Sequence, residues 1–148
     1  MMKTPVVEKQ LAAADAKAFV LAGKAVFTIR SLKTGKRYTY RVRKAPEKQG
    51  WAPAWFVSFL TGPDNAASYS YLGMIRNGEF KLTAKSKMTE ASEPVLAFWW
   101  LWKVLAAGTL SGIEFWHAGR CGRCGHVLTV PESIECGIGP ECKQLMAA

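Results

Sequence analysis

Residues 25–44 read AVFTIRSLKTGKRYTYRVRK, and their alternating pattern decides the fold. On both sides of the central KTGK turn, apolar and polar side chains alternate as they do along strands that bury one face. The pattern predicts a β-hairpin of residues 25–31 and 36–44. If Leu32 faces Arg37, one face of this hairpin collects four apolar side chains, with Phe27 opposite Val42 and Ile29 opposite Tyr40.

The opposite face of the same hairpin is predicted to be cationic. Residues 24–48 hold most of the basic excess of a chain whose formal net charge is +9 at pH 7. A stripe of this kind favours contact with nucleic-acid phosphates. A solvated surface or an acidic protein partner fits the same charges. Four arginines share this face: Arg30, Arg37, Arg41 and Arg43. Successive side chains on the same face of one strand lie about 7 Å apart. The candidate phosphate contacts are Arg30, Lys33, Lys36, Arg37, Arg41, Arg43 and Lys44.

Other segments predict further strands and a first helix. In chain order we expect a helix over residues 7–21, a strand over 55–61, a hairpin of 69–76 and 79–84, and a short strand over 113–116. The second hairpin is closed by Asn77-Gly78, a dipeptide typical of two-residue turns, and its register pairs Ile75 with Phe80.

Residues 93–107 are predicted to form the central helix. Ser92 is a suitable N-cap, and Gly108 is a suitable residue to end the helix. The segment is apolar almost all round, so we expect it to be buried with three tryptophans in the core: Trp99, Trp100 and Trp102. These elements predict an α+β fold, an antiparallel sheet of about five to six strands packed on one long buried helix.

Aromatic residues near the basic hairpin leave a choice open. Tyr38 and Tyr40 interleave with the arginines but are expected on the apolar face. Trp51 and Trp55 flank Pro53 after the basic loop. An exposed indole at either position would offer bases a stacking surface, whereas a buried one would belong to the core.

Four cysteines have the spacing of metal ligands, Cys121-x2-Cys124-x11-Cys136-x5-Cys142. The glycine after Cys124 lets the chain curl so that backbone N–H groups face the thiolates. His117, four residues before Cys121, is a competing fourth ligand, so His117 and Cys136 both remain candidates beside Cys121, Cys124 and Cys142. Four protein ligands leave no position for water, and we expect one structural Zn²⁺ per chain.

Residues 117–142 read HAGRCGRCGHVLTVPESIECGIGPEC. This stretch resembles a small, uncharacterised zinc-binding family of bacteriophage, prophage and some bacterial proteins. The family pattern is His-x3-Cys-x2-Cys-Gly, then Leu-Thr-x-Pro-Glu-Ser-Ile, then Gly-x-Gly-Pro-x-Cys. Because the position of Cys136 is commonly not cysteine in that pattern, the resemblance implies His117 as the fourth ligand. It implies a zinc-supported module with no agreed activity.

The chain of 148 residues is 49% hydrophobic, enough for one core. We expect an α+β domain over residues 1–116 and a zinc-binding module over 117–148 packed against it. The most apolar run, residues 94–107, contains Lys103 and is too short for a bilayer, and we expect neither a membrane segment nor a secretory signal. Clustered cysteines fit a reducing interior, so a cytoplasmic location is expected, that of the host cell for a phage-encoded protein.

Motifs of catalysis are not evident. The signatures of zinc deaminases, zinc proteases and phosphate-binding loops do not occur, and His126 fits a surface position, so we do not expect an enzyme. Two functions remain. The first is a small phage-encoded nucleic-acid-binding protein that contacts DNA or RNA through the basic hairpin. The second is a protein-binding adaptor or inhibitor of host machinery that docks through the zinc module and Trp116. The sequence leaves the oligomeric state open.

Overall fold

A computed structural model describes residues 9–11, 13–46, 49–61, 69–108, 110, 112–117, 120–125, 137–139 and 144–145. The helices and strands in chain order are β1 (Lys9–Gln10), α1 (Ala13–Val20), β2 (Lys24–Ser31), β3 (Arg37–Lys44), β4 (Ala54–Leu60), β5 (Tyr69–Arg76), β6 (Glu79–Lys81), α2 (Glu93–Ala107) and β7 (Ile113–His117).

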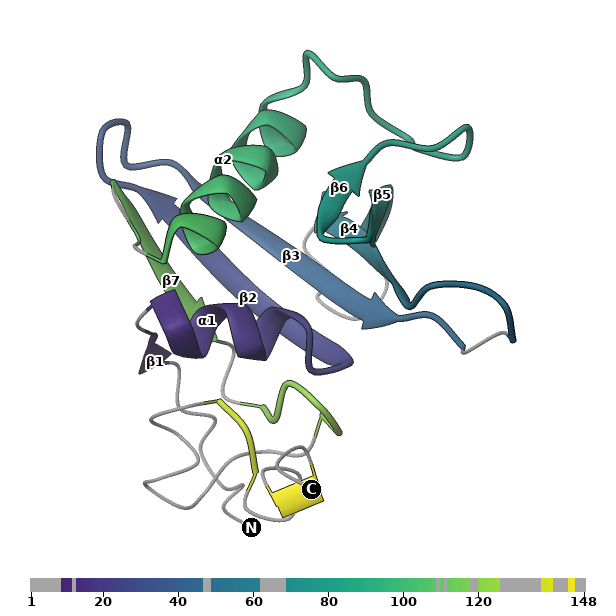
Figure 1. The fold of residues 1–148 in the computed structure, drawn as a ribbon. Coiled ribbons are helices and arrows are strands. Elements are labelled where there is room, and N and C mark those ends of the chain that lie inside the picture. Colours follow the sequence, from purple (N-terminus) through teal and green to yellow (C-terminus); the bar gives the residue numbers. More distant parts are fainter. Residues whose placement is uncertain are drawn as a thin grey trace, which may run out of the picture.

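The strands form one antiparallel sheet in the order β1-β7-β2-β3-β4-β5-β6. Both helices lie on the same face of this sheet (Figure 1). The predicted α+β class is therefore confirmed. The sheet has one strand more than expected because the two-residue β1 adds to the free edge of β7, where the N–H of Leu11 also donates to the carbonyl of Phe115. The first helix is correspondingly shorter than the predicted range of residues 7–21.

The β2–β3 hairpin forms as the alternation predicted, but its register differs by two residues. Phe27 pairs with Tyr40, and Ala25 takes the place opposite Val42. The turn lies one residue earlier in the chain than predicted. Its closing hydrogen bond runs from the N–H of Ser31 to the carbonyl of Lys36, and Gly35 adopts a left-handed φ of 73°. A slip of an even number of residues keeps every side chain on its face, so the predicted apolar and cationic faces are correct.

The β5–β6 hairpin confirms its predicted turn and register. Asn77 and Gly78 both have positive φ, 55° and 75°, as a two-residue turn of this type requires, and Ile75 pairs with Phe80. Strand β6 ends at Lys81 rather than at the predicted residue 84. A register irregularity between Val57 and Ser58 interrupts the pairing of β4 with β5, which re-aims the side chains beyond it.

Helix α2 has the predicted bounds and is buried on one side. Gly108 ends it with a left-handed φ of 81°, and the helix packs on the sheet through residues that include Val95, Phe98 and Leu105. Trp102 is also buried and Trp99 is partly buried against the core, but Trp100 is 41% exposed, so the prediction of three core tryptophans is wrong for Trp100. The helix packs on one side only, and the residues on its other side, among them Leu96, remain exposed.

The core lies between the helices and the sheet. Phe19 of α1 makes edge contacts with Phe27 and Phe115, and the hydroxyl of Tyr40 donates to the carbonyl of Pro94 at 2.7 Å. Cys121 and Ile138, from the segment after β7, belong to the same buried cluster. No helix among the described residues is long and apolar enough to cross a membrane.

Candidate functional site

The face of the sheet opposite the helices is here called the outer face (Figure 1). Strand pairing fixes which side chains meet on it. Arg43 lies beside Phe56, which lies beside Met74. In the next row Arg41 lies beside Ser58, which lies beside Tyr71. Within the described part of the chain, no helix or strand covers these side chains.

The four arginines predicted to share one face do so. Arg30 pairs with Arg37, while Arg41 and Arg43 continue along β3 on the same side of the sheet. Arg37 and Arg43 are exposed. Arg30 also forms an ion pair with Glu114 of β7 at 3.2 Å, which offsets part of its charge. Three of the four arginines, Arg37, Arg41 and Arg43, therefore lie on one strand, β3.

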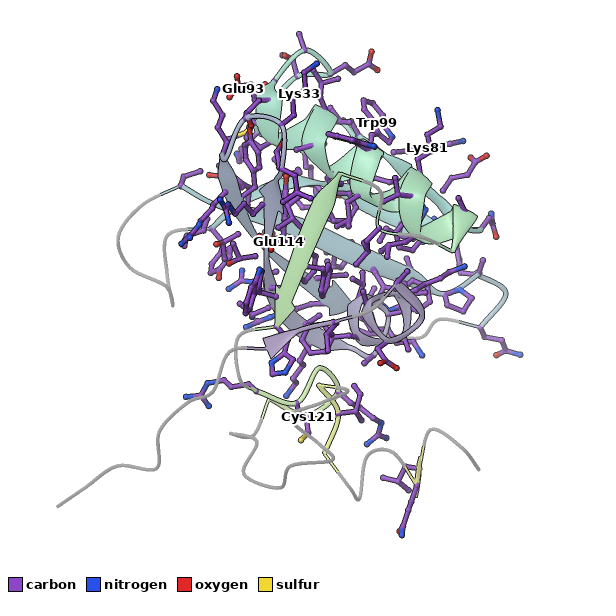
Figure 2. The ribbon with its side chains drawn as sticks, turned by 90° about the vertical axis from the view of Figure 1, so that its left-hand side faces the viewer. Lys33, Lys81, Glu93, Trp99, Glu114 and Cys121 are labelled. Carbon is purple, nitrogen blue, oxygen red and sulfur yellow. The ribbon has the colours of Figure 1, made fainter. Side chains whose placement is uncertain are left out.

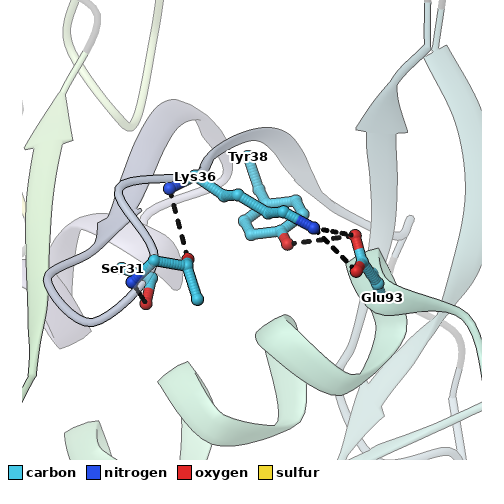
Figure 3. A network of polar contacts seen from close by, with 5 residues as sticks. Ser31, Lys36, Tyr38 and Glu93 are labelled. Atoms are coloured by element: carbon cyan, nitrogen blue, oxygen red, sulfur yellow. Dashed lines mark hydrogen bonds and ion pairs between the residues drawn. The ribbon is translucent and has the colours of Figure 1, made fainter.

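Three predicted contacts lie elsewhere. Lys33 is exposed in the turn that follows β2. Lys36 Nζ donates to both carboxylate oxygens of Glu93, at 2.9 and 3.2 Å, so its charge is directed toward the start of α2 (Figure 3). Lys44 alternates with Arg43 along the strand and lies 5.9 Å from the centre of the Trp55 ring, on the other side of the sheet. The predicted basic site thus separates into an arginine face and three lysines outside it.

Aromatic side chains also lie on the outer face, and the sequence did not predict them there. The Arg41 guanidinium lies 4.3 Å above the centre of the Tyr69 ring. Partial burial, followed by the neighbouring Arg43, lowers the pKa of Arg41. Phe56 contacts Tyr71 edge to face, with ring centres 6.1 Å apart. Residues 54–60 read AWFVSFL, which is almost continuously apolar and has no clear alternation of polar and apolar residues. The outward direction of Phe56 therefore follows only from its pairing with Arg43 of β3.

Of the two tryptophans weighed as stacking residues, only Trp51 is exposed. Its exposed fraction is 65%, and the Arg76 guanidinium lies 5.3 Å from the centre of its ring. Trp55 is partly buried and donates its indole N–H to the carbonyl of Leu21 at 3.0 Å. Tyr40 is fully buried, as predicted for the apolar face, and burial raises its pKa.

A second candidate site surrounds Cys121, in the segment that follows β7 (Figure 2). Its sulfur accepts N–H groups from Gly139 at 3.2 Å and from Arg123 at 3.4 Å. Burial opposes ionisation of this thiol, but the N–H groups of Gly139, Cys124 and Arg123, together with the Cys124 side chain, lower its pKa. Backbone N–H groups therefore face this sulfur, as the sequence predicted.

His117 ends β7 with its side chain completely buried, stacked at a tilt on Phe19 with ring centres 5.8 Å apart. Among the residues that the structure describes, no three His, Cys, Asp or Glu side chains gather closely enough to hold a metal ion. Cys136 and Cys142, two of the five candidate ligands, lie outside the described residues, as does His126. The predicted ligand set therefore remains a prediction.

Comparison with known proteins gives one result. Residues 116–146 match the model of a family of unknown function, DUF6011. The chain is similar to that family over residues 116–146, which begin in β7 and include the cysteine-containing segment, and the match does not include β2 to β6. Neither a search of curated proteins nor a search of solved structures finds a match. The family description assigns no activity to either candidate site.

Proposed function

We propose that this chain is a small, zinc-containing nucleic-acid-binding protein, encoded by a phage or prophage, that contacts phosphates through its outer face. The observation that supports this most is that Arg37, Arg41 and Arg43 all lie along β3 on a sheet face that neither α1 nor α2 covers. Neighbouring cations repel one another, and an anionic backbone relieves that repulsion. The excess of basic residues in the chain, +9, adds a long-range attraction to any polyanion.

Charge reversal on this face tests the proposal. Arg37→Glu with Arg43→Glu should weaken nucleic-acid binding strongly and reduce the slope of log affinity against log salt by about two, one for each phosphate that the variant no longer binds. Fluorescence anisotropy with labelled DNA and RNA across a salt series measures both quantities. Lys17→Glu with Lys103→Glu changes the net charge equally on exposed helical positions and serves as the matched control.

The two variants separate a local contact from general charge. Equal weakening by both pairs would mean that only the net charge matters, which contradicts the assignment of the outer face. A parent protein that binds no oligonucleotide even at low salt would contradict the proposed function. It would favour the alternative of a protein-binding adaptor that docks through the zinc module.

The proposed zinc ion would be held by Cys121, Cys124, Cys142 and either His117 or Cys136. The N–H groups around the Cys121 sulfur fit a metal-bound thiolate, and the ion would cross-link the segment after β7. Metal analysis of freshly purified, reduced protein should give one zinc per chain. His117→Ala should lose zinc, whereas Cys136→Ser should retain it. The reverse result would make Cys136 the fourth ligand, and a zinc content near zero in the parent would contradict the site.

A further inference from the structure

Two hollows on the outer face adjoin at Phe56. The first has a volume of about 600 Å³, and its walls include Pro46, Trp51, Pro53, Phe56 and Arg76. The second has a volume of about 580 Å³, and its walls include Phe56, Tyr71, Met74 and Lys85. Phe56 is therefore a partition shared by both hollows, and it is 39% exposed.

Each hollow combines flat apolar walls with a cation. In the first, the Trp51 indole faces the Arg76 guanidinium at 5.3 Å, and the Nε atom of Arg76 is buried with no hydrogen-bond partner among the described residues. In the second, the Tyr71 and Phe56 rings meet edge to face, and Lys85 forms part of the same wall. No carboxylate of the described residues lines either hollow. Aromatic faces next to cations are the surroundings in which proteins stack nucleobases.

The arginines of β3 lie next to these hollows at Phe56. Arg43 lies directly beside Phe56 across the β3–β4 pair, and Arg41 follows two residues away on the same strand. A strand places such positions about 7 Å apart, a spacing comparable to that of phosphates in an extended single strand. A nucleic-acid strand whose sugar-phosphate backbone runs along β3 would therefore direct its bases toward β4 and β5, where the hollows are.

We infer that the outer face binds single-stranded nucleic acid. Two neighbouring bases would lie one on each side of Phe56, and their phosphates would contact Arg41 and Arg43. In a duplex both faces of a base are stacked on its neighbours, so a duplex offers these hollows no free base. The preference is thus for single strands with little dependence on sequence, since every base has a stacking face. This inference rests on the proposed function and adds the form of nucleic acid that it takes.

The test compares four labelled probes by fluorescence anisotropy with the full chain. They are thymidine and uridine strands of about twelve nucleotides, a DNA duplex of the same length, and an abasic DNA strand that keeps the phosphates and lacks the bases. The parent protein should bind both base-bearing strands at least ten-fold more tightly than the duplex or the abasic strand, because stacking contributes roughly ten-fold or more per base. A difference between the thymidine and uridine strands then assigns DNA or RNA as the preferred partner.

Variants at Phe56 and Trp51 test whether the bases bind in the two hollows. Phe56→Ala and Trp51→Ala should each weaken binding of the base-bearing strands by roughly ten-fold, leave the abasic strand within about two-fold, and keep the salt slope, because the arginines that bind phosphate are unchanged. Phe56→Leu retains the apolar bulk and lacks the ring, so it should also weaken binding of the base-bearing strands. It replaces the alanine variant should that variant fail to fold. Leu96→Ala, at an exposed apolar position of α2, is the control.

Two results would overturn the inference while leaving the proposed function intact. One is equal affinity of the parent for single strand, duplex and abasic strand. The other is unchanged single-strand affinity in both Phe56 variants. In either case Arg37→Glu with Arg43→Glu still reports on phosphate binding, so a failure of the base sites is distinguishable from a failure of the arginine face.

Discussion

Gly122 occupies a position where a larger side chain does not fit. A Cβ atom there would lie 2.6 Å from Cδ2 of the Phe19 ring and 3.1 Å from the carbonyl oxygen of Phe19. The backbone of Gly122 is also used twice, since its N–H donates to Gly137 and its carbonyl accepts from Lys24. This one residue therefore joins α1, the start of β2 and the segment that follows β7.

Gly122→Ala is expected to destabilise the protein by about 1–3 kcal/mol, because the new methyl group overlaps a buried ring that is held on several sides. Urea unfolding followed by circular dichroism measures the change. Gly139→Ala is the matched control, since a Cβ atom at that position meets Cys121 only at 3.8 Å, an ordinary contact. Equal stability of the two variants would contradict the close packing at Gly122.

Single residues were predictable where the two-residue period of a strand was clear. The alternation in RYTYRVRK placed Arg37, Arg41 and Arg43 on one face without knowledge of the register. It could not place Lys36, because that residue lies in the turn and its direction is set by Glu93, far away in the sequence. It could not find Phe56 either, because β4 is apolar on both faces and has no alternation to read.

Hairpins differ in how firmly their turns fix the register. Asn77 and Gly78 both take the left-handed conformation that their turn requires, so the register of β5 and β6 followed from the sequence alone. The turn between β2 and β3 has only one such residue, Gly35, within a longer loop, and several closures are compatible with it. The pairing observed there depends on contacts of Phe27 with Tyr40 and Phe115 that no local signal encodes.

The β2–β3 turn is tied to the first turn of α2 by Lys36, Tyr38 and Glu93. Hydrogen bonding to Lys36, together with its charge, lowers the pKa of Glu93, and the same contact raises the pKa of Lys36. A lowered carboxylate pKa gives stability that is present above the ordinary glutamate value and disappears as the pH falls through the lowered value. Stability from the raised lysine disappears only at high pH, so the contact is intact around neutrality.

Glu93→Gln should therefore lower the melting temperature slightly at pH 7 and not at all at a pH well below the ordinary glutamate range. The effect is small because both side chains are largely exposed, and added salt should reduce it further. Thermal unfolding at several pH values measures it. Glu90→Gln, at an exposed acid outside this contact, should show no such pH dependence. A Glu93→Gln effect that persists in acid would exclude the ion pair as its cause.

Parts of the segment after β7 pack against the sheet domain. Ile138 and Cys121 are buried in the common core, and the rings of Phe19 and His117 enclose Gly137. The local spacing of the cysteines predicts a unit, and this stays a prediction because Cys136 and Cys142 lie outside the described residues. The contact of Gly122 and Gly137 with α1 could not be predicted, since Phe19 is far away in the sequence and carries no signal of its partners.

Removal of the proposed zinc ion should consequently destabilise the whole molecule. A chelator, or Cys124→Ser, is expected to lower the midpoint of one cooperative transition instead of producing a separate early one, because the segment and the domain share buried side chains. Differential scanning calorimetry distinguishes the two cases. A second, independent transition that alone responds to the chelator would show that the two parts unfold separately.

The position of β7 between β1 and β2 has a consequence for biosynthesis. A ribosome completes β2 through β6 as a run of neighbouring hairpins well before it releases residues 113–117. Until then one edge of β2 has no strand beside it, and the inner surface around Phe27 lacks the cover of Phe115. The nascent chain is thus most exposed to edge-to-edge association just before β7 emerges, when a chaperone would be of most use to it.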